Sequence, residues 1–410
     1  EVAFGLENLC LPEAEIEERV NHWLARFELE AVRDQANNTL SGGQKQRLML
    51  ASILAMGPRL LLLDEPLAQL DAAGVAELLD ELDRLRATGL IVVVAEHRLD
   101  ELLRRADRLL ILAGGRIISD SSSKGAEATA ALVQADLAPP TPQPVFIARS
   151  TAPSSAEFIV RINGLTFRWP GKAEALWSDV RFDIHPGECV ALVGPNGSGK
   201  TTLLSALAGL LRPAAGQVEW SEAPRGSSSI GLTPQNPDLA LFCRTVGEEL
   251  AFGPQQLNLP ASEIEQRVSQ AAEALSIDDL LDQAPLALSQ GQRLRVAVAA
   301  ALTLHPRLLL LDEPSTGQDP RHVGRLLTAV RGYVASGDVG AVLFSTHDPR
   351  LVERYATRVL AVAEGKLLAD CAPVVLFANE GLLSRAGLRA TSRRLQSTTA
   401  PVARLARPPR

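Results

Sequence analysis

An internal repeat constrains the fold of this chain more than any other feature of its sequence. Three pairs of polar residues recur with one offset of 248 positions: Ser41 and Ser289, Asp64 and Asp312, and Asp71 and Asp319. The same shift places the opening stretch Ala3-Phe4-Gly5 on Ala251-Phe252-Gly253. Because one fixed offset over separated positions is typical of duplicated structural units, the sequence predicts two homologous domains.

The repeat also predicts the domain boundaries. Residue 1 aligns with residue 249, so the first copy has no equivalent of Gly194–Thr202, and we interpret the chain as a fragment of a longer protein, with a truncated gene as the alternative. The predicted organisation is a partial first domain (1–118), a linker rich in Pro, Ser and Ala (119–157), a complete second domain (158–373) and an Arg-rich tail (374–410). We interpret the segment after Leu383 as solvated, with a membrane-surface or partner contact as the alternative.

Composition excludes several classes of protein. The formal net charge of −7 gives no overall basic field, which argues against sequence-independent binding of nucleic acid. The four cysteines are scattered without metal-ligand spacing, so neither a disulfide framework nor a zinc site is expected, and a reducing cytoplasm fits. The apolar runs are far shorter than the ~20 residues that cross a bilayer, so no segment is predicted to span a membrane.

A glycine-rich loop in the second copy predicts a phosphate site. The apolar run 190–193 has the character of a strand, and a helical pattern follows the loop Gly194-Pro195-Asn196-Gly197-Ser198-Gly199-Lys200-Thr201-Thr202. Glycines let backbone N–H groups converge on phosphates at a helix N-terminus. Lys200 adds a positive charge, and the Thr201 hydroxyl is a ligand for Mg²⁺. A chance glycine-rich turn is a poor explanation for a match at all eight positions from Gly194 to Thr201 in this context.

Two adjacent carboxylates follow a second apolar strand pattern. Leu308–Leu311 lead into Asp312 and Glu313, and the first copy repeats the pattern at 60–65. One carboxylate can hold hydrated Mg²⁺ and the next can polarise an attacking water, which suits Asp312 and Glu313 respectively. Alone, such a pair is usually structural. The phosphate loop on the same domain favours the catalytic interpretation.

A helix start with serine and glycines precedes each carboxylate pair. In the first copy it reads Leu40-Ser41-Gly42-Gly43-Gln44, and by itself it would be an ordinary N-cap. Its serine lies 23 residues before the first carboxylate in both copies, which makes the motif informative. The second copy has Gln290 where the first has Gly42, and this departure puts phosphate binding by the second motif in doubt.

Together these residues resemble the ABC ATPase family. Residues 194–201 look like its Walker A motif, 40–44 like its signature, and 60–65 and 308–313 like Walker B. Further matches are the D-loop residues Asp71 and Asp319, the switch histidines His97 and His347, the Q-loop Gln235, and Trp169 where the family stacks an aromatic ring on adenine. A lone histidine or tryptophan is more often a packing residue, and only the family context favours these roles.

The resemblance implies a fold and a mechanism. The fold class is α/β: P-loop NTPase domains with a parallel-rich central sheet, an antiparallel β subdomain and a helical signature subdomain, in two copies. ATP would lie between Walker A of one domain and the signature residues Ser41, Gly42, Gly43 and Gln44 of the other, with the domains paired head to tail. Glu313, His347 and Gln235 would be catalytic, and Mg²⁺ would contact Thr201, Gln235 and Asp312.

A longer string narrows the resemblance to one branch. Gln235-Asn236-Pro237-Asp238 and the stretch 245–254 look like the energy-coupling-factor ATPases of cobalt and vitamin importers. This implies ATP and Mg²⁺ as cofactors, a transmembrane coupling subunit, a small membrane substrate-binding subunit, and a location at the cytoplasmic face of the cell membrane. No nucleic acid is expected. The alternatives are a soluble tandem ABC ATPase acting on ribosomes or nucleic acid, which the neutral linker disfavours, and a remnant that does not hydrolyse ATP.

Overall fold

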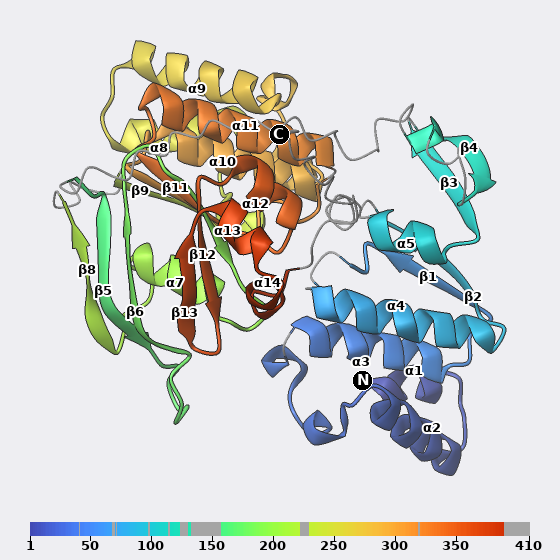
Figure 1. Cartoon of the computed structure of the whole chain (residues 1–410). Helices are drawn as coiled ribbons and strands as arrows, with labels where there is room; N and C mark the ends of the chain where they lie inside the picture. Colours follow the sequence, from blue (N-terminus) through green and yellow to red (C-terminus); the bar gives the residue numbers. More distant parts are fainter. Residues whose placement is uncertain are drawn as a thin grey trace, which may run out of the picture. The chain divides into compact units, whose positions relative to one another are not determined.

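The computed structural model describes residues 1–40, 42–67, 70, 72–96, 99–113, 115–123, 130–132, 157–221, 229–318 and 320–388. Internal contacts divide the chain into two compact units, Glu1–Ala138 and Pro139–Arg410. Figure 1 shows the helices and strands of both. Each unit is described by itself.

The second unit is built on a six-stranded sheet with the order β13-β12-β7-β11-β10-β9. Five strands are parallel and β13 is antiparallel to its neighbour β12. The strand bounds are β7 (Cys189–Val193), β9 (Ile230–Thr233), β10 (Leu308–Leu311), β11 (Ala341–Ser345), β12 (Arg358–Ala363) and β13 (Lys366–Cys371). This is the parallel-rich central sheet that the sequence predicts.

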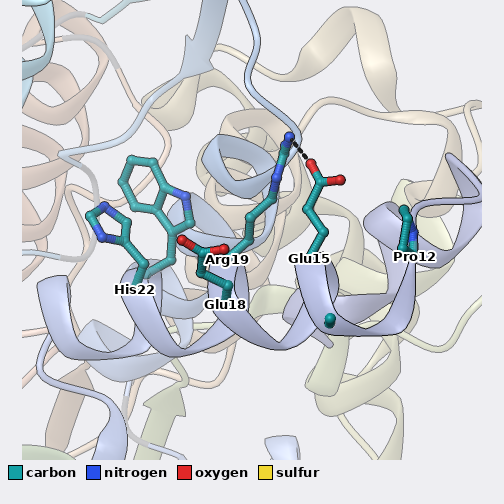
Figure 2. A pocket seen from close by; sticks show the side chains of 7 residues that line it. Pro12, Glu15, Glu18, Arg19 and His22 are labelled. Carbon is teal, nitrogen blue, oxygen red and sulfur yellow. Dashed lines mark hydrogen bonds and ion pairs between the residues drawn. The ribbon is translucent and has the colours of Figure 1, made fainter.

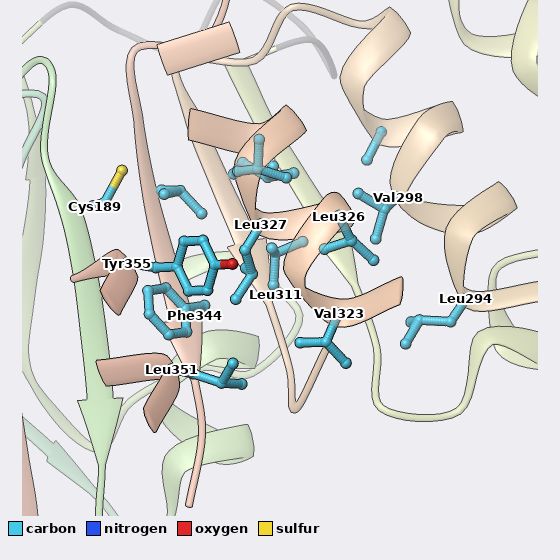
Figure 3. Close-up of a cluster of buried hydrophobic side chains, with 14 of the residues drawn as sticks. Cys189, Leu294, Val298, Leu311, Val323, Leu326, Leu327, Phe344, Leu351 and Tyr355 are labelled. Atoms are coloured by element: carbon cyan, nitrogen blue, oxygen red, sulfur yellow. The ribbon is translucent and has the colours of Figure 1, made fainter. Parts of the chain in front are cut away.

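Strands β7, β10 and β11 are buried on both faces, and their side chains alternate between two hydrophobic cores. Leu309 and Leu311 of β10 face one core, whereas Leu308 and Leu310 face the other. The first core packs the sheet against helices. Figure 3 shows Leu311 and Phe344 beside side chains of one of these helices.

Helices cover the first core, and a small antiparallel sheet with one helix covers the second (Figure 1). The helices on the first core are α8 (Val246–Gln256), α9 (Ala261–Leu275), α10 (Gln290–Thr303), α11 (Pro320–Ser336), α12 (Pro349–Tyr355), α13 (Pro373–Ala378) and α14 (Glu380–Arg385). The second core is closed by α7 (Lys200–Leu207) and by the sheet of β5 (Val160–Phe167), β6 (Trp177–Ile184) and β8 (Ala215–Trp220). Among the described residues, no helix combines the length and apolar character needed to cross a bilayer.

The first unit repeats part of this architecture. Its elements are α1 (Val2–Asn8), α2 (Glu13–Arg26), α3 (Gly42–Ala55), β1 (Leu60–Asp64), α4 (Ala72–Ala87), β2 (Ile91–Ala95), α5 (Leu99–Arg105), β3 (Arg108–Ala113) and β4 (Arg116–Ser122). Strands β1 and β2 pair in parallel, as do β10 and β11, and β3 and β4 form an antiparallel pair, as do β12 and β13.

Side-chain contacts recur with the same offset as the sequence landmarks. Arg19 donates to Glu15 at 2.6 Å, as Figure 2 shows, and to the Ala55 carbonyl at 3.0 Å. Arg267 does the same with Glu263 and the Thr303 carbonyl, at 2.6 and 3.0 Å. In the first unit this arginine links α2 to the end of α3, and in the second unit it links α9 to the end of α10. The recurrence fits two copies of one fold.

One face of the β1–β2 pair is apolar and exposed. Leu60, Leu62, Ile91 and Val93 all lie on it, and Leu62 is 66% exposed. Leu310, the equivalent of Leu62, is 0% exposed because it packs in the second core beneath α7 and the antiparallel sheet. The first unit therefore displays a surface that the second unit buries.

The structure moves two of the predicted boundaries. Strand β4 continues to Ser122, so the boundary predicted at residue 118 lies inside a strand. The boundary predicted between residues 373 and 374 lies inside α13, and Leu383, Ala386 and Leu388 beyond it are buried in the first core. The solvated interpretation is therefore wrong for Ala386 and Leu388, whose side chains are buried, whereas Ser384 and Arg385 are exposed. The arginines from Arg389 onward lie outside the described residues.

The matched leucines test this difference between the units. We expect Leu310→Ala to lower the free energy of unfolding by about 2–5 kcal/mol, because it leaves a cavity in a close-packed core. Leu62→Ala should change it by less than about 0.5 kcal/mol, since its side chain is exposed. Urea unfolding of the full chain followed by circular dichroism measures both. Equal losses in the two variants would contradict the assignment of the exposed face.

Candidate nucleotide site

Three parallel strands of the second unit bring the predicted residues to one edge of the sheet. The phosphate loop follows β7, Asp312 and Glu313 follow β10, and His347 follows β11 by two residues. Strand β11 pairs with both β7 and β10, so their carboxyl ends meet. In open α/β sheets ligands bind outside these strand ends.

Close contacts fix the shape of the phosphate loop. A Cβ atom at Gly194 would overlap the carbonyl oxygen of Val362 in β12, so only glycine fits there. Gly199 has φ +92°, and a Cβ there would lie 2.8 Å from two atoms of the Trp177 indole. Glycine adopts such conformations without the cost that other residues incur. The loop is thereby packed between β12 and β6.

Lys200 begins helix α7 and turns back over the loop. Its ammonium Nζ donates to the carbonyl oxygens of Gly194 at 2.8 Å and Pro195 at 3.3 Å. The side chain is buried, and Nζ lies 4.0 Å from Oε1 of Glu313. The positive charge is held at the loop, where an anionic phosphate group would gain most from it.

Asp312 is a buried carboxylate, 3% exposed, held by two hydroxyl groups. Thr201 Oγ1 donates to Oδ2 at 2.7 Å, and Ser345 Oγ donates to Oδ1 at 2.6 Å. Burial raises the pKa of Asp312, while the hydrogen bonds from Ser345 and Thr201 oppose that rise. Carboxylate and hydroxyl oxygens are hard ligands of the kind Mg²⁺ prefers, and Thr201 and Asp312 stand together as such a pair.

Glu313 lies at the centre of the charged cluster and is 7% exposed. Its N–H donates to Ser345 Oγ at 2.8 Å, and its Oε2 is 2.9 Å from Nδ1 of His347. Burial alone would raise the pKa of Glu313, but the charge and hydrogen bond of His347 and the charge of Lys200 lower it overall. An ionised carboxylate at this position can accept a proton or orient a water molecule.

Trp169 is the most exposed of three aromatic residues in contact, Trp169, Phe167 and Trp177, and the third of these packs against the phosphate loop. It is 44% exposed and stands edge-on to Phe167, with ring centroids 5.1 Å apart. Phe167 in turn lies 5.5 Å from the ring of Trp177, which packs on Gly199. A half-exposed indole in this place has a face available for stacking.

The other predicted loop residues and Gln235 lie around this cluster. Thr202 is buried, and the hydroxyl of Ser198 has no hydrogen-bond partner among the described residues. Gln235 follows β9 by two residues, and β9 pairs with β10, so it emerges at the same edge as Asp312. No hydrogen bond joins the Gln235 side chain to another described residue, and its contact with Mg²⁺ stays a prediction.

The signature residues belong to the first unit. Helix α3 begins at Gly42, and no described residue lies within 4 Å of the position a Cβ would take at Gly43. Gln44 lies in the first turn of the same helix. Ser41, Asp71, His97 and Asp319 lie outside the described residues. Pairing of this signature with the loop of the second unit stays a prediction.

The sequence analysis missed three residues that hold the cluster: Ser345, Trp177 and Val362. Ser345 bridges Asp312 and the N–H of Glu313, yet it gives only a weak signal as the last residue of an apolar strand. Comparison of the two repeats could have found it, because the first copy has Ala95 two residues before its histidine. Contacts of Trp177 and Val362 with loop glycines leave no local pattern in the sequence.

Comparison with known proteins agrees with this geometry. The family model described as ABC transporter matches residues 4–68 and 177–316. A putative ABC transporter ATP-binding protein of Methanosarcina mazei is 37% identical over 90% of this chain and 71% of its own length. The putative HMP/thiamine import ATP-binding protein YkoD of Bacillus subtilis is 34% identical over 95% of this chain and 76% of its own.

A solved structure is also similar. It is cbiO1 from Clostridium perfringens, part of the ABC transporter complex cbiONQ, at 28% identity and a TM-score of 0.51. The match covers 59% of this chain and 99% of that one. An ABC ATPase fold is therefore shown by sequence and by structure.

The Ser345 bridge can be tested by removing its hydroxyl. Ser345→Ala should lower the free energy of unfolding by about 1–3 kcal/mol, because a buried carboxylate and a backbone N–H each lose a partner. Ser336→Ala removes an exposed hydroxyl that contacts Asp338 and should cost much less. Thermal or urea unfolding of both variants is the measurement. A loss at Ser345 no larger than at Ser336 would show that the bridge contributes nothing.

Proposed function

The chain belongs to the ABC transporter family, whose ATP-binding members are P-loop ATP hydrolases, and on this premise we propose that it powers import of a small solute through an energy-coupling-factor-type transporter. The solute would be a vitamin, a vitamin precursor or a metal ion. The observation that carries the proposal is the cluster of Lys200, Thr201, Asp312, Glu313 and His347 at one sheet edge.

In this proposal the second unit binds ATP. Backbone N–H groups of the loop and the Lys200 ammonium bind the phosphates, and Trp169 stacks on the adenine. Thr201 and Asp312, with Gln235, hold Mg²⁺. The metal, when bound, neutralises charge on the phosphate oxygens. The proposal is supported by the 2.7 Å contact between Thr201 Oγ1 and Asp312 Oδ2, which places two hard oxygen ligands side by side.

Hydrolysis is assigned to Glu313 and His347. Glu313 is ionised, because its pKa is lowered, and it orients the attacking water and accepts its proton. His347 holds the Glu313 carboxylate through the 2.9 Å contact and presents its imidazole toward the terminal phosphate. Burial keeps both groups in a medium where charge interactions are strong.

The first unit completes this site in our proposal. Ser41, Gly42 and Gly43 at the start of α3 would cover the phosphates from the opposite side, with Gln44 behind them. The support is the space around Gly43, where no described residue would contact a Cβ and a phosphate could approach the backbone closely. By contrast, the second unit carries Gln290 at the corresponding start of α10.

Similarity to importers supports the direction of transport. One relative bears a name that refers to HMP/thiamine import, and cbiO1 is described as part of the complex cbiONQ. The residues 235–238 that resemble the energy-coupling-factor branch form the turn and short helix after β9. We therefore propose a transmembrane coupling subunit and a small membrane substrate-binding subunit as partners.

An exposed apolar cluster supports a docking surface for the coupling subunit. Leu239, Phe242 and Phe252 are all exposed, and Leu239 and Phe242 follow shortly after Gln235 in the sequence. The rings of Phe242 and Phe252 meet edge-to-face at 4.8 Å, and Glu249 accepts from the N–H groups of Phe242 and Cys243. Exposed aromatic residues held in a fixed geometry are typical of interaction surfaces. We place the chain at the cytoplasmic face of the membrane through this contact.

Replacement of the proposed water-orienting residue separates binding from turnover. Glu313→Gln should lower steady-state ATP hydrolysis by about 10²-fold or more, because the amide cannot accept the proton. ATP affinity, measured by equilibrium titration, should stay close to wild type. Glu265→Gln on the outer surface of α9 serves as the control. Full turnover in Glu313→Gln would remove Glu313 from this role.

Membrane association tests the docking surface and the rival function together. We expect the full chain, expressed in its source cells, to float with membranes in a density gradient. The double variant Leu239→Ser and Phe242→Ser should weaken this association by about tenfold or more, because two apolar contacts are lost. Leu210→Ser, exposed to 67% as Phe242 is, should have no effect. Sedimentation with ribosomes instead would favour the soluble alternative.

A further inference from the structure

The C-terminal segment of the second unit has so far been assigned no part in the site. It runs from α13 through α14 to Leu388, and the buried residues Leu376, Leu383 and Leu388 join it to the first core. The two oxygens of Glu364, in the β12–β13 turn, accept from Arg385 at 3.1 and 3.0 Å. The segment is thus fixed to the sheet from two sides.

Helix α14 ends in a tight turn around Gly387. The N–H of Leu388 donates to the Leu383 carbonyl at 3.0 Å, and the N–H of Gly387 donates to the Ser384 carbonyl at 2.9 Å. Gly387 has φ +70°. This pair of hydrogen bonds, with glycine in the left-handed region and both Leu383 and Leu388 buried in the same core, is the Schellman motif. The turn has one defined conformation.

The Gly387 turn presses directly on the phosphate loop. A Cβ atom at Gly387 would lie 2.9 Å from both Cα and N of Pro195, and 3.3 Å from its Cβ. Pro195 is the second residue of the loop, and the close atoms belong to its backbone. A side chain at position 387 would therefore have to displace the loop itself.

Pro195 connects this contact to the lysine. Its carbonyl oxygen, with that of Gly194, accepts from the ammonium group of Lys200. A shift of the Pro195 backbone moves one of these two acceptors. Movement of the loop is also restricted elsewhere, because Gly194 packs closely against Val362 and Gly199 packs closely against Trp177.

We propose that the Gly387 turn is a positioning element of the phosphate loop. Contact with this turn fixes the position of the Pro195 backbone, and the Pro195 carbonyl oxygen in turn helps to position the Lys200 ammonium group. The turn thereby raises the affinity of the second unit for the phosphate chain of its nucleotide. The inference rests on the proposed nucleotide binding and adds a part of the chain more than 180 residues from the loop in sequence.

The test compares glycines that share a backbone conformation but differ in their neighbours. Gly387→Ala and Gly387→Asn both introduce a Cβ against Pro195, and asparagine tolerates positive φ better. Gly337→Ala is the control: Gly337 has φ +86°, and no atom of the described part of the chain lies within 4 Å of the Cβ that alanine would add. Binding of Mg-ATP and of magnesium tripolyphosphate, which has no base, is measured by calorimetry on the full chain. Tm is measured alongside.

We expect both Gly387 variants to weaken binding of both ligands by about tenfold, which corresponds to about 1.4 kcal/mol. Gly337→Ala should bind both as the wild type does, and its fall in Tm gives the cost of straining a positive φ alone, to which Gly387→Ala adds the contact with Pro195. Equal affinities in Gly387→Ala, Gly387→Asn and Gly337→Ala would overturn the inference. A wild-type chain that binds neither ligand would instead overturn the proposed nucleotide site.

Discussion

Two adjacent carboxylates buried at the end of one strand are the constraint around which the second unit is arranged. Neighbouring negative charges removed from water repel each other and lose hydration, so each needs its own compensating groups. Asp312 receives two hydroxyl hydrogen bonds, whereas Glu313 lies between the imidazole of His347 and the ammonium of Lys200. Those partners come from β11, from the turn after it and from the start of α7. Parallel pairing of β7, β11 and β10 brings all of them to the pair.

The first unit contains the same Asp-Glu pair after a strand, at Asp64 and Glu65, but in a different structural environment. Glu65 has φ +45° and Glu313 has φ +49°, so the backbone after the strand takes the same turn in both copies. Asp64 and Glu65 are nevertheless exposed, and Ala95 occupies the position of Ser345. Local sequence therefore determines the turn, whereas the burial of the carboxylates and their hydroxyl partners depend on the surrounding structure. A strand that ends in Asp-Glu is not by itself a reactive site.

This division explains which features could be predicted from sequence. The phosphate loop, the two carboxylates and His347 belong to short patterns whose spacing reflects local geometry, and the structure brings them together. The sheet follows from apolar runs of strand length. Ser345 and Gly387 escaped prediction because their importance lies in contacts with residues far away along the chain. The exposed face around Leu62 escaped because periodicity shows that a strand is apolar, not what covers it.

The phosphate loop illustrates why such distant contacts are needed. Positive φ at Gly197 and Gly199 is open to glycine, but it is not favoured over other conformations, so the loop sequence alone leaves much backbone freedom. Three contacts remove that freedom: Val362 against Gly194, Trp177 against Gly199, and Gly387 against Pro195. They come from β12, from the start of β6 and from the turn after α14. The binding conformation of the loop is therefore a property of the folded unit, and the C-terminal turn belongs to it as much as the glycines do.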